Sequence, residues 1–462
     1  MNSLIHKILI SAAMGAAVVG LASCGGGGGP QVADGGIGGT GITQGRVTSF
    51  GSIFVNGIEF NTDDASFTVN NMAATQDDLA IGMVVSISGS SDASNASGIA
   101  DSVSYDSLIE GVVSSNDITN NNTLEVMDQT ITVDGDTVYD NHIDATTLEN
   151  LPVNSEVEVS GFTDGTGTVL ATRIEVKSLA WAGGELEVSG VISAVSGNQF
   201  QIGSLVIDAS SIPSIPPAGT FVEVEGDSFS GDLFVADSIE IEGDGSRVVA
   251  EDGEEVEIEG QITQALDANN FFSLNGQVVD ASATSLSGAT SQLTAGRVAE
   301  VDGVMNGDIL LAEEIELKAT SSERGEIGGV LGIGNVDTAA GTVTLLGQTI
   351  KVDSSTIMES DVGESSSFTL EQLISSDYLE AKVYIDNGML VASKLELEQA
   401  PSNHNAEVKG MPNSVSPSTI EIFGILIDIS GVDDNSFASQ QIEVKGNFSN
   451  GVLIATSIKE ED

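Results

Sequence analysis

Histidine side chains are the first groups in this sequence that could do acid–base or metal chemistry. The three histidines, His6, His142 and His404, are isolated, and none has a second histidine two to four positions away, the spacing typical of an imidazole-bound zinc site. His142 and His404 stand between polar loop residues. We therefore expect both to be surface histidines and predict no metal site built on imidazole.

Serine and carboxylate side chains are the next candidates for catalysis. No Gly-x-Ser-x-Gly elbow is present, and paired acidic residues occur along the whole chain. Pairs such as Glu156 and Glu158, or Glu223 and Glu225, fall on one face of a strand because side chains alternate with period two. A solvated β surface accounts for these pairs, so we predict no catalytic residue, no cofactor and no enzymatic activity.

Clustered carboxylates favour hard cations such as Ca²⁺. Two acidic segments are the best candidates: Asp134, Asp136, Asp140 and Asp144 in the first, and Asp244, Glu251, Asp252, Glu254 and Glu255 in the second. Neither segment has the ligand spacing of an EF-hand. We expect charged loops that bind divalent cations weakly and without a defined cage, and we predict no metal site.

Aromatic side chains form the ligand platforms of many oligonucleotide- and sugar-binding barrels. Only 4% of the residues are aromatic, and Phe200, Phe221 and Phe271 lie in strand patterns, where a core position is expected. Trp181 stands in a polar joint and is the aromatic residue whose surroundings indicate exposure. We predict that Trp181 contacts a partner or the adjacent repeat.

The charge of the chain excludes one class of partner. The sequence has 14 basic and 69 acidic residues and a formal net charge of −55. Phosphate backbones are bound through clusters of lysine and arginine, so this negative field repels nucleic acid. The same charge keeps an exported protein soluble and attracts divalent cations weakly.

The N-terminal residues have the pattern of an export signal. Lys7 precedes an apolar run over residues 8–19 that is too short to span a bilayer comfortably. The run ends in Leu21-Ala22-Ser23-Cys24, which resembles the bacterial lipobox, where the cysteine thiol receives diacylglycerol. Because Cys24 is the only cysteine, no disulfide can form within one chain. We predict a signal peptide at residues 1–23 and lipidation of Cys24.

A flexible segment follows the lipidation site. Residues 24–43 are rich in glycine and have too few side chains to pack, so we predict a tether between the lipid and the first folded repeat. Gly25, rather than aspartate, follows Cys24. In bacterial lipoproteins this resemblance implies transfer to the outer membrane, with the periplasmic and surface faces both open. The attached acyl chains would hold the protein firmly on the bilayer.

The rest of the chain repeats one pattern. Six apolar segments that each contain an alanine recur at intervals of about 60 to 80 residues, and each closes one unit. The alanines are Ala100, Ala171, Ala236, Ala312, Ala392 and Ala455. The predicted repeats are residues 44–105, 107–178, 185–242, 254–318, 324–398 and 406–460. Polar joints separate them, and we expect a string of separate units that bends at these joints.

Each repeat shows one order of elements. A Gly-containing apolar strand opens it, and a hairpin such as residues 271–280 follows. A segment such as 147–151 or 369–374 then suits one or two helical turns after a threonine cap. An alternating strand that ends in glycine and the alanine strand complete the unit. Residues 379–385 of the fifth repeat lack this glycine, and we expect that repeat to close differently.

This order predicts an all-β fold. The expected architecture is a tandem array of about six small five-stranded OB-like barrels, each with a short helix between strands 3 and 4. Units of this size have too few strands for an immunoglobulin-like pair of sheets, so the barrel is favoured over an open sandwich. Barrel closure also removes the exposed strand edges through which β-rich chains aggregate.

Two neighbouring segments resemble a known family. Gly35-Gly-Ile-Gly-Gly-Thr-Gly41 runs into Gly45-Arg-Val-Thr-Ser-Phe-Gly-Ser-Ile-Phe-Val-Asn-Gly57, and the closing strands repeat behind it. This pattern resembles bacterial lipoproteins that carry repeats of the domain of unknown function numbered 5666. The resemblance is most specific over residues 35–60. It implies tandem small barrels in the cell envelope and brings no activity or site residues.

The sequence therefore predicts a non-enzymatic, membrane-anchored envelope lipoprotein that acts as a multi-domain spacer or binding array. Its affinity would arise from several copies acting together. Two alternatives stay open: a module that binds glycans or envelope proteins, and a structural protein that responds to divalent cations. The expected partners are the outer membrane, through the lipid anchor, and envelope proteins or glycans.

Overall fold

The computed structural model describes residues 40–92, 96–141, 143, 146–231, 233–241, 250–284, 292–318, 324–353, 355–362, 367–386, 388–412, 414–416, 418–432 and 441–461. The predicted signal peptide, Cys24, the tether up to residue 39, His142, Asp144 and Asp244 lie outside these residues. Nearly all regular structure within them is β-strand, which confirms the all-β class. No helix among the described residues is long and apolar enough to cross a bilayer.

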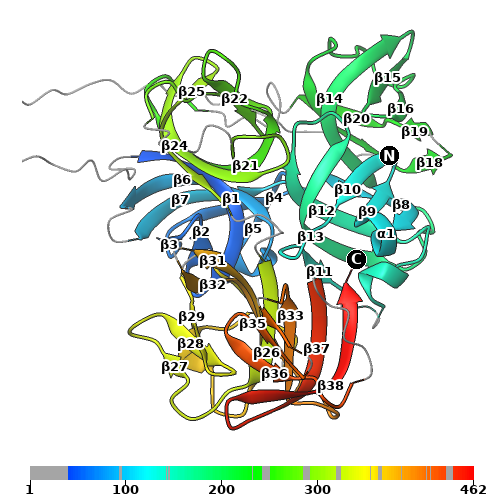
Figure 1. The fold of residues 1–462 in the computed structure, drawn as a ribbon. Helices are drawn as coiled ribbons and strands as arrows, with labels where there is room; N and C mark the ends of the chain where they lie inside the picture. The colour runs from blue at the N-terminus through cyan, green and yellow to red at the C-terminus, as the bar shows by residue number, and fades with distance from the viewer. Residues whose placement is uncertain are drawn as a thin grey trace, which may run out of the picture. The chain divides into compact units, whose positions relative to one another are not determined.

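The strands of the first repeat close into a small barrel-like sheet (Figure 1). Its elements are β1 (Thr40–Phe50), β2 (Ile53–Val55), β3 (Ile58–Asn61), β4 (Ser66–Val69), β5 (Met72–Ala74), β6 (Val84–Asp92) and β7 (Ser97–Tyr105). β1 pairs antiparallel with β2 and β6, and β2 pairs antiparallel with β3. β7 pairs antiparallel with β6 and parallel with β3, which completes the ring.

The same pairing scheme recurs along the chain. The second repeat contains β8 (Ile109–Asp117), α1 (Ile118–Asn121), β9 (Thr123–Val126), β10 (Gln129–Thr132), β11 (Val138–Asp140), β12 (Glu156–Thr163) and β13 (Thr168–Ser178). The third contains β14 (Leu186–Ser196), β15 (Gln199–Ile202), β16 (Leu205–Asp208), β17 (Phe221–Gly226), β18 (Ser228–Ser230), β19 (Leu233–Val235) and β20 (Ser238–Ile241). The fourth contains β21 (Glu255–Gln264), β22 (Phe271–Leu274), β23 (Gln277–Asp280), β24 (Val298–Asn306) and β25 (Ile309–Leu317).

The first strand is split in two in the last part of the chain. The fifth repeat contains β26 (Arg324–Val330), β27 (Val336–Asp337), β28 (Thr342–Leu345), β29 (Gln348–Lys351), β30 (Ile357–Ser360), β31 (Tyr378–Asp386) and β32 (Met389–Glu398). The sixth contains β33 (Ala406–Gly410), β34 (Ser414–Val415), β35 (Thr419–Ile422), β36 (Ile425–Asp428), β37 (Gln441–Ser449) and β38 (Val452–Glu461). In both repeats the last strand pairs parallel with the second strand of the hairpin, β29 with β32 and β36 with β38.

The predicted helix between strands 3 and 4 is not supported. Among the described residues, this segment holds a single 3₁₀ turn in the first, second and fifth repeats: η1 (Gln76–Asp78), η3 (Leu148–Asn150) and η6 (Leu370–Gln372). Each turn follows a threonine, as predicted, but the next residue is already extended, so the turn cannot propagate. In the third repeat Pro213, Pro216 and Pro217 occupy this segment, and proline has no N–H to continue a helix.

The recurring glycine and alanine face each other at a β-bulge. Gly161 lies opposite Ala171, with a register shift just before the glycine, and a Cβ at Gly161 would lie 2.2 Å from the carbonyl oxygen of Leu170. Gly89, Gly226, Gly303 and Gly446 have the same contact with the last strand of their own repeats, at 2.1 to 2.2 Å. The glycine is therefore required by a close approach of two backbones.

The fifth repeat keeps this bulge without the glycine. Val383 takes the glycine position, opposite Ala392, and the register shift again falls directly before it. Val383 is fully buried. The prediction that this repeat closes differently is therefore wrong at this point, because the bulge is kept. The strands accommodate the Val383 side chain at the position where the other repeats have glycine.

The repeats also pair with one another through their first strands. β1 pairs parallel with β21, β8 pairs antiparallel with β14, and β26 pairs antiparallel with β33. Three sheets result, and each joins the strands of two repeats. The buried apolar side chains of the second and third repeats form one cluster, as do those of the fifth and sixth. The predicted string of separate units is therefore wrong, and the first repeat pairs with the fourth rather than with its neighbour in sequence.

Candidate functional site

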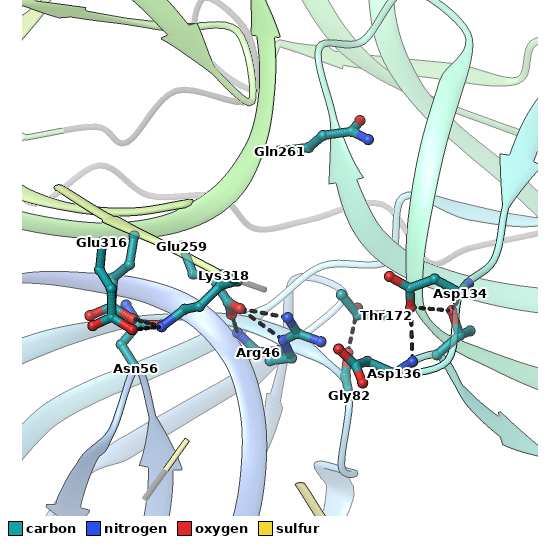
Figure 2. A network of polar contacts seen from close by, with 12 residues as sticks. Arg46, Asn56, Gly82, Asp134, Asp136, Thr172, Glu259, Gln261, Glu316 and Lys318 are labelled. Carbon is teal, nitrogen blue, oxygen red and sulfur yellow. Dashed lines mark hydrogen bonds and ion pairs between the residues drawn. The ribbon is translucent and has the colours of Figure 1, made fainter. Parts of the chain in front are cut away.

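A buried ion pair joins the first and fourth repeats. The parallel register places Gln44 opposite Ile258 and so brings Arg46 next to Glu259. Nη2 and Nε of Arg46 donate to Oε1 of Glu259 at 2.7 and 2.9 Å, and the two side chains are 12% and 6% exposed. Burial would raise the pKa of Glu259, but the guanidinium outweighs it and holds this pKa below its usual range. Figure 2 shows the pair among its neighbours.

A row of carboxylates extends from this pair across the fourth repeat. Glu259, Glu300 and Glu316 stand directly opposite one another on β21, β24 and β25. Like charges in this arrangement repel, so a counter-charge is needed. Lys318 supplies it, because its Nζ lies 3.0 Å from Oε2 of Glu300 and 3.4 Å from Oε1 of Glu316.

The first acidic segment takes part in ion pairs within the chain. Asp136 of the second repeat pairs with Arg324 of the fifth. Burial would raise the pKa of Asp136, but the positive charges of Arg324 and Arg46 outweigh this effect and lower the pKa. Asp140 pairs with Arg173, whose Nη1 also donates to the carbonyl oxygen of Ile81 in the first repeat at 3.3 Å. Two carboxylates of the segment that we expected to be a charged loop are therefore held in ion pairs with arginines of the chain.

The second acidic segment is used in turns. Oδ1 of Asp252 accepts the backbone N–H of Gly307, and Oε2 of Glu254 accepts the backbone N–H of Glu251 at 2.7 Å. Among the residues that the structure describes, no group of three or more acidic, histidine or cysteine side chains has the geometry to hold a metal ion.

A cavity of about 610 Å³ lies where the first, second, fourth and fifth repeats meet. Its cationic lining residues are Arg46, Lys318, Arg324 and Lys351. Its acidic lining residues are Asp136, Glu259, Glu300, Glu316, Asp353 and Asp386. Four of the chain's 14 basic residues therefore surround one cavity, together with six carboxylates. The buried side chains of Ile81, Val138 and Ile357 pack together and join three of the same repeats.

A second carboxylate row crosses the boundary between the second and third repeats. Glu158, Glu110, Glu187 and Glu225 stand opposite one another on β12, β8, β14 and β17. Glu158 is 6% exposed, and its Oε1 accepts the hydroxyl of Tyr105 at 2.8 Å. The prediction that these strand glutamates form a solvated surface is therefore wrong for Glu158, and also for Glu223, which is buried.

This row predicts that stability falls as pH rises. Burial, followed by repulsion from Glu223, raises the pKa of Glu187 to about 9, and burial followed by repulsion from Glu158 raises that of Glu110 to about 7. In the folded state these two carboxyls keep their protons at pH values where the unfolded chain has already released them. Their contribution to stability is therefore fully present at acidic pH and is lost as the pH rises through about 7 for Glu110 and about 9 for Glu187. We expect the denaturant concentration at the midpoint of unfolding to decrease as the pH is raised from 5 to 9.

The variant Glu187→Gln tests this pH dependence. Glutamine cannot ionise and keeps the shape of the side chain, so the decline should become shallower and the variant should gain about 1 kcal/mol at pH 9. The matched control is Glu313→Gln, an exposed residue of β25. A pH profile of Glu187→Gln that is as steep as that of the parent chain would contradict the assignment.

Trp181 and His404, which the sequence analysis expects at exposed positions, both have close neighbours in the structure. Trp181 is half-buried against the core of the second and third repeats, and its backbone N–H donates to the carbonyl oxygen of Asn154 at 2.7 Å. His404 was predicted at the surface, but its side chain is only 8% exposed and its Nε2 lies 3.4 Å from Oε2 of Glu407. Phe200 is fully buried, Phe221 is buried and Phe271 is half-buried.

The sequence analysis does not single out Arg46, Lys318 or Arg324. Arg46 lies in β1, Lys318 directly follows β25, and Arg324 begins β26, so the first of them is far from the other two in the chain. The sequence signal that could have identified them is the rarity of basic residues, because the chain has 14 of them and 69 acidic residues. A rare cation within a strand of such a chain is a candidate for a buried ion pair.

Comparison with known proteins identifies the repeating domain. The family described as "Domain of unknown function (DUF5666)" matches residues 44–104, 110–175, 244–316 and 333–396, which together make up more than half of the chain. These four matches confirm tandem repeats of one domain. No curated protein matches the chain.

Proposed function

The chain belongs to the family built from the domain of unknown function DUF5666, and on that premise we propose that it is a non-enzymatic, membrane-anchored envelope lipoprotein acting as a multi-domain spacer or binding array. The observation that supports this proposal is the use of its charged side chains. Arg46, Arg173 and Arg324 each contact a carboxylate or carbonyl oxygen of another repeat. These groups join the repeats to one another.

The proposed unit of this array is an OB-like barrel. In the first repeat the ring runs β1, β2, β3, β7, β6 and back to β1, and the parallel pair β3–β7 closes it. This is the strand order of a five-stranded OB-type barrel, without its helix. Pairing between the first strands of two repeats would join such barrels through a shared sheet.

Lipidation of Cys24 is the proposed attachment to the outer membrane. We expect Cys24→Ala to remove the lipid and to release the protein from the membrane fraction, because acyl chains supply about 0.8 kcal/mol per buried methylene and no other anchor is proposed. The measurement is incorporation of labelled fatty acid together with membrane fractionation. Ser23→Ala is the control, since a small residue is kept beside an intact cysteine.

The outcomes of this experiment separate the parts of the proposal. A Cys24→Ala protein that still carries fatty acid, or that sediments with the outer membrane as the parent does, would contradict the anchor. Turnover of a substrate by the purified parent chain in hydrolase and transferase assays would contradict the non-enzymatic role. Binding of glycans or envelope proteins and response to divalent cations are the alternatives, and glycan arrays, pull-downs and melts with millimolar calcium test them.

A further inference from the structure

One wall of the cavity between the repeats is a single row of side chains across the fifth repeat. Arg324 of β26 stands opposite Tyr384 of β31, and Tyr384 stands opposite Val391 of β32. Val391 in turn stands opposite Lys351 of β29. Residues that are directly paired project from the same face of a sheet, and all four line the cavity. This wall therefore presents an aromatic ring and an aliphatic side chain between two cations.

The facing wall comes from the fourth repeat and presents hydrogen-bond acceptors. Glu259, Glu300 and Glu316 stand in one row across three strands and line the cavity (Figure 2). Glu316 and Lys318 of this repeat both act electrostatically on Tyr384, so the two walls lie within reach of each other. A ligand in the cavity would therefore meet the Tyr384 ring on one side and carboxylate oxygens on the other.

The cations of both walls are already paired with carboxylates. The pairs are Arg46 with Glu259, Lys318 with Glu300 and Glu316, Arg324 with Asp136, and Lys351 with Asp353. A cationic ligand would compete with an arginine or a lysine for these carboxylates, and an anionic ligand would compete with a carboxylate. Breaking a buried ion pair is costly, so the cavity favours a ligand without net charge.

The paired groups keep hydrogen-bonding capacity for such a ligand. A carboxylate has several acceptor sites and a guanidinium has several donors, so one ion pair does not use all of them. Asp136 is 4% exposed and pairs with Arg324 through Oδ2, and its Oδ1 accepts no hydrogen bond from the described residues. A buried acceptor without a donor is costly. A hydroxyl of a ligand could donate to this oxygen and accept from an arginine or a lysine in the same site.

We propose that the cavity binds a neutral sugar of one or two rings, with the C–H face of a ring against Tyr384 and Val391 and its hydroxyls toward Asp136 and the carboxylates of the fourth repeat. A sugar combines an apolar ring face with hydroxyls that both donate and accept, which matches the two walls. The cavity volume of about 610 Å³ lies within the roughly 300–1,000 Å³ typical of small-molecule sites. The inference gives the binding-array part of the proposed function a ligand, and it rests on that part.

Saturation-transfer NMR on the full chain, in a detergent without a sugar headgroup, tests the proposal. The probes are glucose, galactose, maltose and trehalose. We expect saturable binding of at least one of them, with the strongest saturation on ring C–H protons, and no saturable binding of putrescine or citrate. Raising NaCl from about 50 to about 500 mM should change the affinity for the sugar by less than about twofold, because a neutral ligand is not screened.

Variants of Tyr384 locate the sugar. Tyr384→Leu should weaken binding by about tenfold, because it removes the aromatic ring from the wall. Tyr384→Phe keeps the ring and should bind within about threefold of the parent chain. The matched control is Tyr139→Leu, which changes a half-buried tyrosine of the second repeat outside the cavity and should bind within about twofold of the parent. Thermal melts check that each variant is folded.

The titrations of the parent chain decide the proposal even if Tyr384→Leu does not fold. Saturable binding of none of the four sugars, or tighter binding of putrescine or citrate, would overturn it. Equal weakening by Tyr384→Leu and Tyr139→Leu would overturn the assignment to this cavity. Failure of the sugar site would leave the membrane anchor standing, since Cys24→Ala tests the anchor separately and leaves the cavity residues unchanged.

Discussion

Arg46→Met is expected to lower the free energy of unfolding by about 3–5 kcal/mol, because it leaves the Glu259 carboxylate buried without its counter-charge. Glu259 is 6% exposed and accepts three hydrogen bonds from Arg46. Methionine keeps much of the aliphatic volume of arginine, so the lost stability reflects the missing positive charge. Chemical denaturation at pH 7 measures it.

Two further variants separate the ion pair from packing. Arg46→Met/Glu259→Leu removes both charges and should recover most of the lost stability, since an apolar pair often replaces a buried ion pair without loss. Lys351→Met breaks an exposed pair with Asp353, whose side chains are 48% and 28% exposed, and should change stability by at most about 1 kcal/mol. If Arg46→Met destabilised no more than Lys351→Met, the pair would not be a structural joint.

Gly161→Ala is expected to destabilise the chain by about 3 kcal/mol or more, because the new Cβ would lie 2.2 Å from a backbone carbonyl oxygen that the neighbouring strand cannot easily move. The same contact recurs at four other glycines, so this result would apply to the bulge of several repeats. Thermal and chemical denaturation measure the change.

Gly431→Ala is the matched control for this glycine. A Cβ at Gly431 meets nothing within 4 Å, and its φ is not in the left-handed region. Alanine at such a position should be neutral or stabilise by about 0.4–1 kcal/mol through the unfolded state. Equal effects of Gly161→Ala and Gly431→Ala would show that the bulge adapts as it does around Val383, and would contradict a steric role for the glycine.

The fold could be predicted from the sequence wherever the signal is local. Alternation of apolar and acidic residues places Val157 and Val159 in the core of β12, and both are fully buried. The recurring glycine faces the recurring alanine at a bulge in the first, second, fourth and sixth repeats, and in the fifth repeat Val383 takes the place of the glycine. The helix prediction at residues 147–151 failed because a threonine cap and a leucine fit a single 3₁₀ turn as well as a longer helix.

The cavity could not be predicted from the sequence because its determinants are not local. Glu158 and Glu259 have the alternation of solvated strand residues, and only pairing between repeats buries them. Nothing in the sequence near Thr43 indicates that β1 lies beside Glu257, more than two hundred residues later, yet their side chains are in hydrogen-bond contact at 3.3 Å. Such contacts depend on which repeats meet.

The position of β1 also decides how the folded part would respond to a pull from the N-terminus. Residues 40–46 of β1 are held on one side by β6, antiparallel, and residues 41–44 on the other side by β21, parallel. Tension applied along β1 would therefore shear both ladders at once instead of peeling one hydrogen bond at a time. A strand held in this way resists mechanical extraction, which would suit the proposed attachment through Cys24.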